Sequence, residues 1–191
     1  MSKLEQLGEA QRRPQLLATY SGDTSPEELR AKLLDAIAQS AFTNLRTYSN
    51  CSRSTLRAVQ EHLETRCEGT VPASVTLAGG IGGTGETCGT VLGALMAIGE
   101  ALGPDSMMDS AQDARAKAAA RAFVVWFNEE YGGTRCFQVQ DALVGWHCDE
   151  ASKVEAWQEA GGPTGCALVC GEAARTAARL ILEEWDSYED S

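Results

Sequence analysis

The residues of this sequence best suited to chemistry are its seven cysteines. An odd number excludes a complete set of intrachain disulfides, and seven is more than a chain in a reducing compartment keeps by chance. Thiols in such a compartment serve metal binding, cluster binding or thiol redox reactions. The cysteines, which predict one of these chemistries, are Cys51, Cys67, Cys88, Cys136, Cys148, Cys166 and Cys170.

Four of them lie at or near the predicted starts of helices: Cys51, Cys88, Cys136 and Cys166. The N-terminus of a helix carries unpaired N–H groups and a positive potential, which together stabilise a thiolate. A thiolate binds metals and attacks disulfides, so we expect a reactive site if the fold brings these four together. Cys88 is the candidate catalytic residue. The alternative for any single cysteine is an inert residue of the apolar core.

The fourth position of such a site has competing candidates. Cys166 and Cys170 are four residues apart and therefore share one face of a helix. His147 is a third candidate, because it places an imidazole beside the thiol of Cys148. The sequence contains no CxxC pair and no CxxCH motif, which disfavours zinc knuckles and covalent haem.

A glycine-rich segment, residues 79–85, leads into Cys88. It formally contains GxGxxG, but no hydrophobic strand precedes it, so a dinucleotide site is disfavoured. Glycines also let the backbone approach a ligand closely and point N–H groups at sulfur. We therefore predict cofactor contacts at Gly82, Gly83, Gly85 and Gly89.

The hydrophobic pattern supplies only helices to position these segments. Ser25-Pro26-Glu27-Glu28 forms a capping box with proline at the first helical position, and apolar residues follow at helical spacing. Further helices are predicted to start near Cys51, Cys88, Ser110 and Cys166, and residues 136–165 are predicted to form short helices and loops. No window alternates between apolar and polar residues as a strand does. We predict an all-α, single-domain bundle with a glycine-rich loop before a central helix.

The predicted central helix carries a small residue at every fourth position: Gly89, Gly93 and Ala97. Such a ridge lets a second helix approach at short distance. It suits either the core of the bundle or a dimer interface.

Composition defines the kinds of partner to expect. The chain has 191 residues, of which 43% are hydrophobic, enough for one domain with its own core. We divide it into an N-terminal arm (1–24), a helical domain (25–187) and an acidic tail (188–191). With 16 Lys and Arg against 27 Asp and Glu, its net charge of -11 argues against nucleic acids and anionic membranes. No signal peptide or membrane span is predicted, so we expect a cytoplasmic protein with protein or small-molecule partners.

The same residues resemble those of a known family. Their order is that of the C_GCAxxG_C_C family, small proteins described as redox-active that carry four characteristic cysteines. The resemblance covers residues 25–185 and rests on Asn50-Cys51, Gly82-Gly83, the run from Thr87 to Met96 around Cys88, Cys136 and Cys166. The sequence departs from the pattern at Thr90, where alanine is usual, and by three further thiols, Cys67, Cys148 and Cys170.

The family is similar to the split-Soret cytochromes, whose helical subunits dimerise and hold an iron–sulfur cluster as well as haem. The resemblance implies a homodimer with a cluster for electron transfer, redox sensing or cluster-dependent catalysis, bound by Cys51, Cys88, Cys136 and Cys166. Haem is not implied, because the attachment motif is absent. Two alternatives remain: a cluster-free thiol–disulfide oxidoreductase, and a zinc- or copper-binding or helical interaction module.

Overall fold

The computed structural model describes residues 25–65, 67–104, 106 and 108–189, which fold into helices and contain no strand. This confirms the predicted all-α bundle; the predicted N-terminal arm lies outside the described residues. No helix in the described part of the chain has the length and apolar character needed to cross a membrane. The elements are α2 (Pro26–Tyr48), α3 (Cys51–Leu63), α4 (Thr70–Ala73), η1 (Ser74–Leu77), α5 (Ala78–Ile81), α6 (Gly89–Leu102), α7 (Ser110–Tyr131), α8 (Cys136–Val144), η2 (Ala151–Lys153), α9 (Val154–Glu159) and α10 (Gly162–Glu189).

Helix α2 starts where the sequence predicts. The Ser25 hydroxyl accepts a hydrogen bond from the backbone N–H of Glu28, and the Glu28 carboxylate accepts one from the N–H of Ser25. Pro26 is the first helical residue, where its missing N–H costs nothing. The helix ends at Ser49, which adopts a left-handed conformation with φ 53°. Its inner face is buried, as the apolar spacing predicts, through Leu29, Leu33, Ile37 and Ala41.

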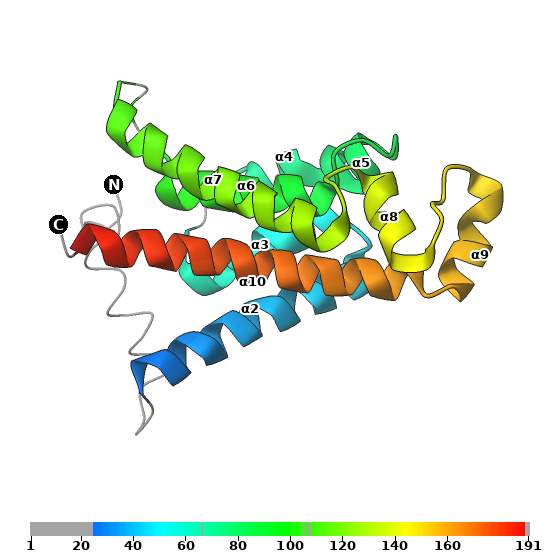
Figure 1. Cartoon of the computed structure of the whole chain (residues 1–191), viewed down its shortest axis with the longest axis horizontal. Coiled ribbons are helices and arrows are strands. Elements are labelled where there is room, and N and C mark those ends of the chain that lie inside the picture. Colours follow the sequence, from blue (N-terminus) through cyan, green and yellow to red (C-terminus); the bar gives the residue numbers. More distant parts are fainter. Residues whose placement is uncertain (1–24, 66, 105, 107, 190–191) are drawn as a thin grey trace.

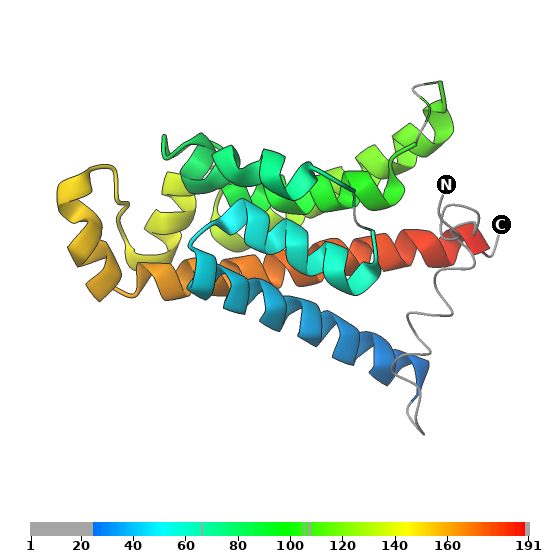
Figure 2. The ribbon, with the colours of Figure 1, turned by 180° about the vertical axis from the view of Figure 1, so that it is seen from behind.

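The long helix α10 is the axis of the bundle. It packs chiefly against α2 and also against α3 and α6. Figure 1 shows it running the length of the molecule with α2 on one side and α6 and α7 on the other, and Figure 2 shows α3 between α2 and α6 on the opposite face. Small side chains let these helices approach, because Ala173, Ala174, Ala177 and Ala178 of α10 are fully buried.

The small-residue ridge of α6 lies in the core, against α3. A Cβ atom at Gly93 would stand 2.3 Å from the backbone oxygen of Ser52, far inside van der Waals contact. At Gly93 the backbones of α3 and α6 are therefore in direct contact. The ridge sets the distance between the two helices that begin at Cys51 and just after Cys88.

Both ends of α10 differ from the sequence prediction. The helix begins at Gly162 rather than at Cys166, with Pro163 as its second residue. The indole of Trp157 packs on Gly162, where a Cβ would lie 2.1 Å from the ring. At the other end α10 continues to Glu189, so the first two residues of the predicted acidic tail are helical.

Candidate functional site

Three of the four predicted site cysteines stand at the N-terminus of a helix, as expected. Cys51 is the first residue of α3, Cys136 is the first residue of α8, and Cys88 is the residue that caps α6. The start of α3 is fixed by Asn50, whose side-chain oxygen accepts the N–H of Arg53 at 3.1 Å. Cys166 differs, because α10 begins one turn earlier and places this residue inside the helix.

The fold brings these four cysteines together from four separate helices. Every pair among them interacts electrostatically, so that a charge on one thiol disfavours a charge on each of the others. Cys88 and Cys136 are buried, and Cys51 and Cys166 are half-buried. We call Cys51, Cys88, Cys136 and Cys166 the four-cysteine site.

Cys88 and Cys136 are hydrogen-bonded to each other, and this bond shifts their pKa values in opposite directions. The hydrogen bond to Cys136, reinforced by burial, raises the pKa of Cys88 well above its ordinary value. The same bond lowers the pKa of Cys136, and the side-chain amide of Gln140 donates a further hydrogen bond to its sulfur at 3.4 Å. The first thiolate of the site therefore forms on Cys136, with the S–H of Cys88 donating to it.

The other two thiols are held in their neutral form. Burial, followed by the charge of Cys88, raises the pKa of Cys51, although the backbone N–H groups of Gly79 and Ser52 partly offset this. Burial raises the pKa of Cys166 to about 12, with smaller contributions from Cys88 and Cys51. Such buried, mutually repelling thiols release their protons readily only if a positive charge replaces them.

The glycine-rich segment forms an ordered turn rather than an open loop. Gly79 and Gly80 have φ values of 65° and 70°, which favour glycine. The N–H of Glu86 donates to the oxygen of Gly80 at 3.1 Å, and the oxygen of Glu86 accepts the N–H of Cys136 at 2.7 Å. The turn also lies beside Thr134, whose oxygen accepts the N–H of Cys88 at 2.8 Å. These bonds fix Cys88 and Cys136 relative to each other through the backbone.

Two glycines pack directly on site cysteines. A Cβ at Gly89 would lie 2.6 Å from the sulfur of Cys51, and a Cβ at Gly80 would lie 2.7 Å from the Cβ of Cys136. Gly89 was predicted as a cofactor contact, whereas Gly80 was not. The signal for Gly80 was its place in the glycine run, but its position against Cys136 depends on a contact across the fold.

The other predicted glycine contacts shape the turn. Gly82 and Gly83 are exposed, have positive φ values and would meet no atom within 4 Å through a Cβ. Gly85 is buried under Phe137, where a Cβ would lie 2.2 Å from the ring. None of these three has a site cysteine among its nearest atoms.

Cys170 lies on the core side of the four-cysteine site. Its side chain is fully buried, and its sulfur is 3.0 Å from the hydroxyl of Thr90. Burial raises its pKa well above the ordinary value, and charges on Cys51 and Cys88 act in the same direction. Cys170 is therefore a packed core thiol whose pKa also depends on the charge of the site.

The remaining candidates lie elsewhere. The Nδ1 of His147 is 2.9 Å from Asp141, and its ring stacks on Phe137 with 4.4 Å between centroids. Cys67 is exposed and Cys148 is half-buried. In the described part of the chain, no three His, Cys, Asp or Glu side chains already stand in an arrangement that could hold a metal ion.

Comparison with known proteins identifies the family. No curated protein and no solved structure gives a match. One family model does match, over residues 49–181, a span that contains every member of the four-cysteine site. This match covers most of the chain and agrees with the resemblance carried by the cysteines and the glycine-rich segment. The chain belongs to the C_GCAxxG_C_C family, whose description is "Putative redox-active protein".

Proposed function

We propose that the four-cysteine site binds an iron–sulfur cluster and that the protein uses this cluster in electron transfer or redox sensing. The observation that carries the proposal is the convergence of four thiols from four helices, each of which interacts with the other three. Four cysteine thiolates are the usual ligands of such clusters.

The donor set fits a cluster in its chemistry. All four ligand atoms are thiols, and three of them are held neutral by burial or by hydrogen bonding, so positively charged iron would replace protons and relieve the mutual repulsion. A bound cluster would supply a one-electron donor and acceptor; the chain supplies the ligands and their environment.

The surroundings of the sulfurs fit as well. Gly89 carries no side chain at the point nearest to Cys51, which leaves the backbone close to that sulfur, and Gly80 leaves it close to the Cβ of Cys136. The N–H of Gly79 points toward the sulfur of Cys51. Hydrogen bonds to ligand sulfur stabilise the reduced, more negative state of a cluster, so these groups would set its potential.

The test is purification of the full chain without oxygen, followed by measurement of iron, acid-labile sulfide and the visible and EPR spectra. We expect iron and sulfide in the wild type and a large loss in each of the variants Cys51→Ser, Cys88→Ser and Cys136→Ser. Cys67→Ser and Cys148→Ser are matched controls, because these thiols lie outside the four-cysteine site. Wild-type protein without iron and sulfide refutes the proposal, and zinc in their place would indicate a structural metal site.

The Cys88–Cys136 hydrogen bond favours a second candidate, a thiol–disulfide oxidoreductase. The Cys136 thiolate would attack a small disulfide and release one thiol, forming a mixed disulfide. Cys88 would then lose its proton, attack the sulfur of Cys136 and release the second thiol. Two protein thiols and one small disulfide would become one protein disulfide and two small thiols. Cluster-free protein that forms a Cys88–Cys136 disulfide with oxidised glutathione, detected by mass spectrometry, supports this candidate.

A further inference from the structure

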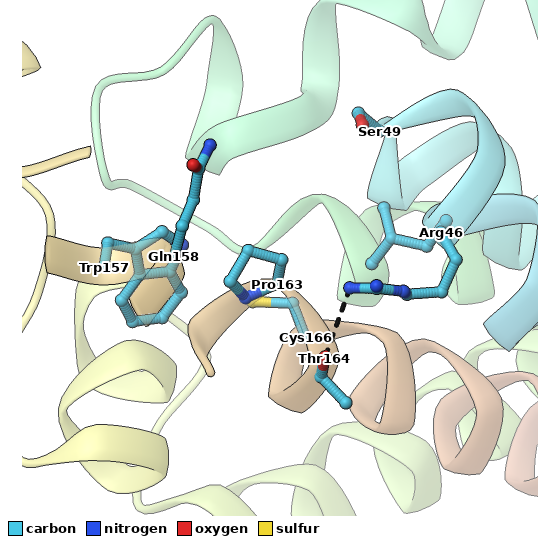
Figure 3. Close-up of a pocket in the computed structure, with 8 residues that line it drawn as sticks. Arg46, Ser49, Trp157, Gln158, Pro163, Thr164 and Cys166 are labelled. Carbon is cyan, nitrogen blue, oxygen red and sulfur yellow. Dashed lines mark hydrogen bonds between the residues drawn. The ribbon is translucent and has the colours of Figure 1, made fainter. Parts of the chain in front are cut away.

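A pocket of about 610 Å³ opens beside the four-cysteine site, and Cys166 belongs to both. Its wall comes from the end of α2, from α9 and from the first turn of α10. Figure 3 shows Arg46 and Trp157 on opposite sides, with Pro163 and Cys166 between them. Pockets of this size hold small organic molecules.

Arg46 gives the pocket an uncompensated positive charge. Its guanidinium donates a hydrogen bond to the hydroxyl of Thr164 at 3.1 Å, and no carboxylate of the described residues pairs with it. None of the described residues that line the pocket is acidic. The chain as a whole carries a net charge of -11, so this local positive charge runs against its overall balance. The pocket is therefore a place where an anion is favoured.

Trp157 gives the pocket a flat apolar wall whose position is fixed. Its indole packs on Gly162, where even a Cβ would clash, and meets the ring of Trp146 edge-on at 6.0 Å between centroids. Pro163 and Leu45 add apolar surface. A planar ring bound here would stack on an aromatic surface that loses little conformational freedom on binding.

We propose that this pocket binds a small planar aromatic carboxylate, with its ring against Trp157, its carboxylate on Arg46 and one edge at Cys166. This proposal rests on the proposed redox function, because a molecule bound here would lie against Cys166, one of the four cysteines proposed to hold the cluster. Guanidinium groups recognise carboxylates through paired, charge-assisted hydrogen bonds. The hydroxyl of Thr164 holds Arg46 in place for this contact.

The probe is 2-naphthoate, titrated into the full chain by isothermal calorimetry. We expect binding to weaken about tenfold in Arg46→Gln, because a charge-assisted hydrogen bond is lost. A similar loss is expected in Trp157→Leu, and 2-naphthamide, which lacks the charge, should bind the wild type correspondingly less well. Arg121→Gln is the matched control, since it removes one exposed arginine from α7, a helix that contributes no residue to the pocket lining.

Two results would overturn the pocket: no binding of 2-naphthoate to the wild type at millimolar concentration, or binding that Arg46→Gln leaves unchanged. Circular dichroism of each variant shows whether the fold is kept; Arg46 is exposed, so its variant keeps the test valid if Trp157→Leu unfolds. Iron and sulfide are measured on the same samples. Binding of 2-naphthoate by protein that lacks iron would support the pocket proposal and refute the cluster proposal. Iron in protein that does not bind 2-naphthoate would support the cluster proposal and refute the pocket proposal.

Discussion

Replacement of Gly93 by alanine tests whether the distance between α3 and α6 is set by backbone contact. The new Cβ would stand 2.3 Å from the oxygen of Ser52 and 3.1 Å from its carbonyl carbon. Because both are backbone atoms, no side chain can rotate away. The start of α3 would have to move by about 1 Å to restore ordinary contact.

The expected loss of stability follows from two opposing terms. Overpacking of this kind lowers the free energy of unfolding by about 1 to 3 kcal/mol, and the better helix propensity of alanine raises it by about 1 kcal/mol. Gly93→Ala should therefore lower the free energy of unfolding by about 0 to 2 kcal/mol, or the Tm by up to a few degrees. The shift falls on the residue next to Cys51, so iron and sulfide content should fall with it.

Gly99 of the same helix is the matched control. It is exposed, and a Cβ there would meet no atom within 4 Å, so Gly99→Ala should raise stability by about 0.5 to 1 kcal/mol through helix propensity alone. Urea and thermal unfolding followed by circular dichroism measure both variants. If Gly93→Ala is as stable as Gly99→Ala, the backbones are not in contact and the reasoning fails.

Two further predictions concern the thiols. Since burial raises the pKa of Cys166 from 9.0 to about 12, folding favours its neutral form; this stabilisation is complete below pH 9.0 and is lost as the pH rises toward 12. In metal-free wild type, the free energy of unfolding should therefore fall between about pH 8 and about pH 10.5. The fall should be smaller by about 2 kcal/mol in Cys166→Ala, and identical pH slopes for the two proteins in urea titrations would contradict this. Iodoacetamide should label exposed Cys67 well before fully buried Cys170, whose thiol has a raised pKa; peptide mapping that finds both labelled at one rate would show that the core around Cys170 opens freely.

The parts of the fold that were predictable from the sequence depend on local chemistry. The capping box at Ser25 and Glu28 and the spacing of apolar residues each act within a few residues, and the structure confirms both. The positions of Cys51, Cys88 and Cys136 at helix starts followed from the same kind of signal. The start of α10 was misplaced because Gly161-Gly162-Pro163 looks like an interruption, whereas Trp157 packs on Gly162 and allows the helix to begin there.

The parts that were not predictable depend on contacts between distant segments. That Cys136 rather than Cys88 takes the first negative charge follows from their mutual hydrogen bond and from Gln140, and neither effect can be inferred from spacing. The pocket is likewise made by Arg46 and Trp157, which the fold places on opposite sides of Cys166. Both features exist only once α2, α6, α8, α9 and α10 have packed.

A contact in the core distinguishes the two candidates for the fourth ligand, Cys166 and Cys170. Thr90 and Cys170 are both buried, and the hydroxyl of Thr90 lies 3.0 Å from the sulfur of Cys170. A buried hydroxyl needs a partner, and Cys170 supplies it. Cys166, one turn earlier on α10, interacts instead with Cys136 as well as with Cys51 and Cys88. This favours Cys166 as the ligand: iron should be lost in Cys166→Ser and retained in Cys170→Ser, and the opposite result would move the ligand one turn along the helix.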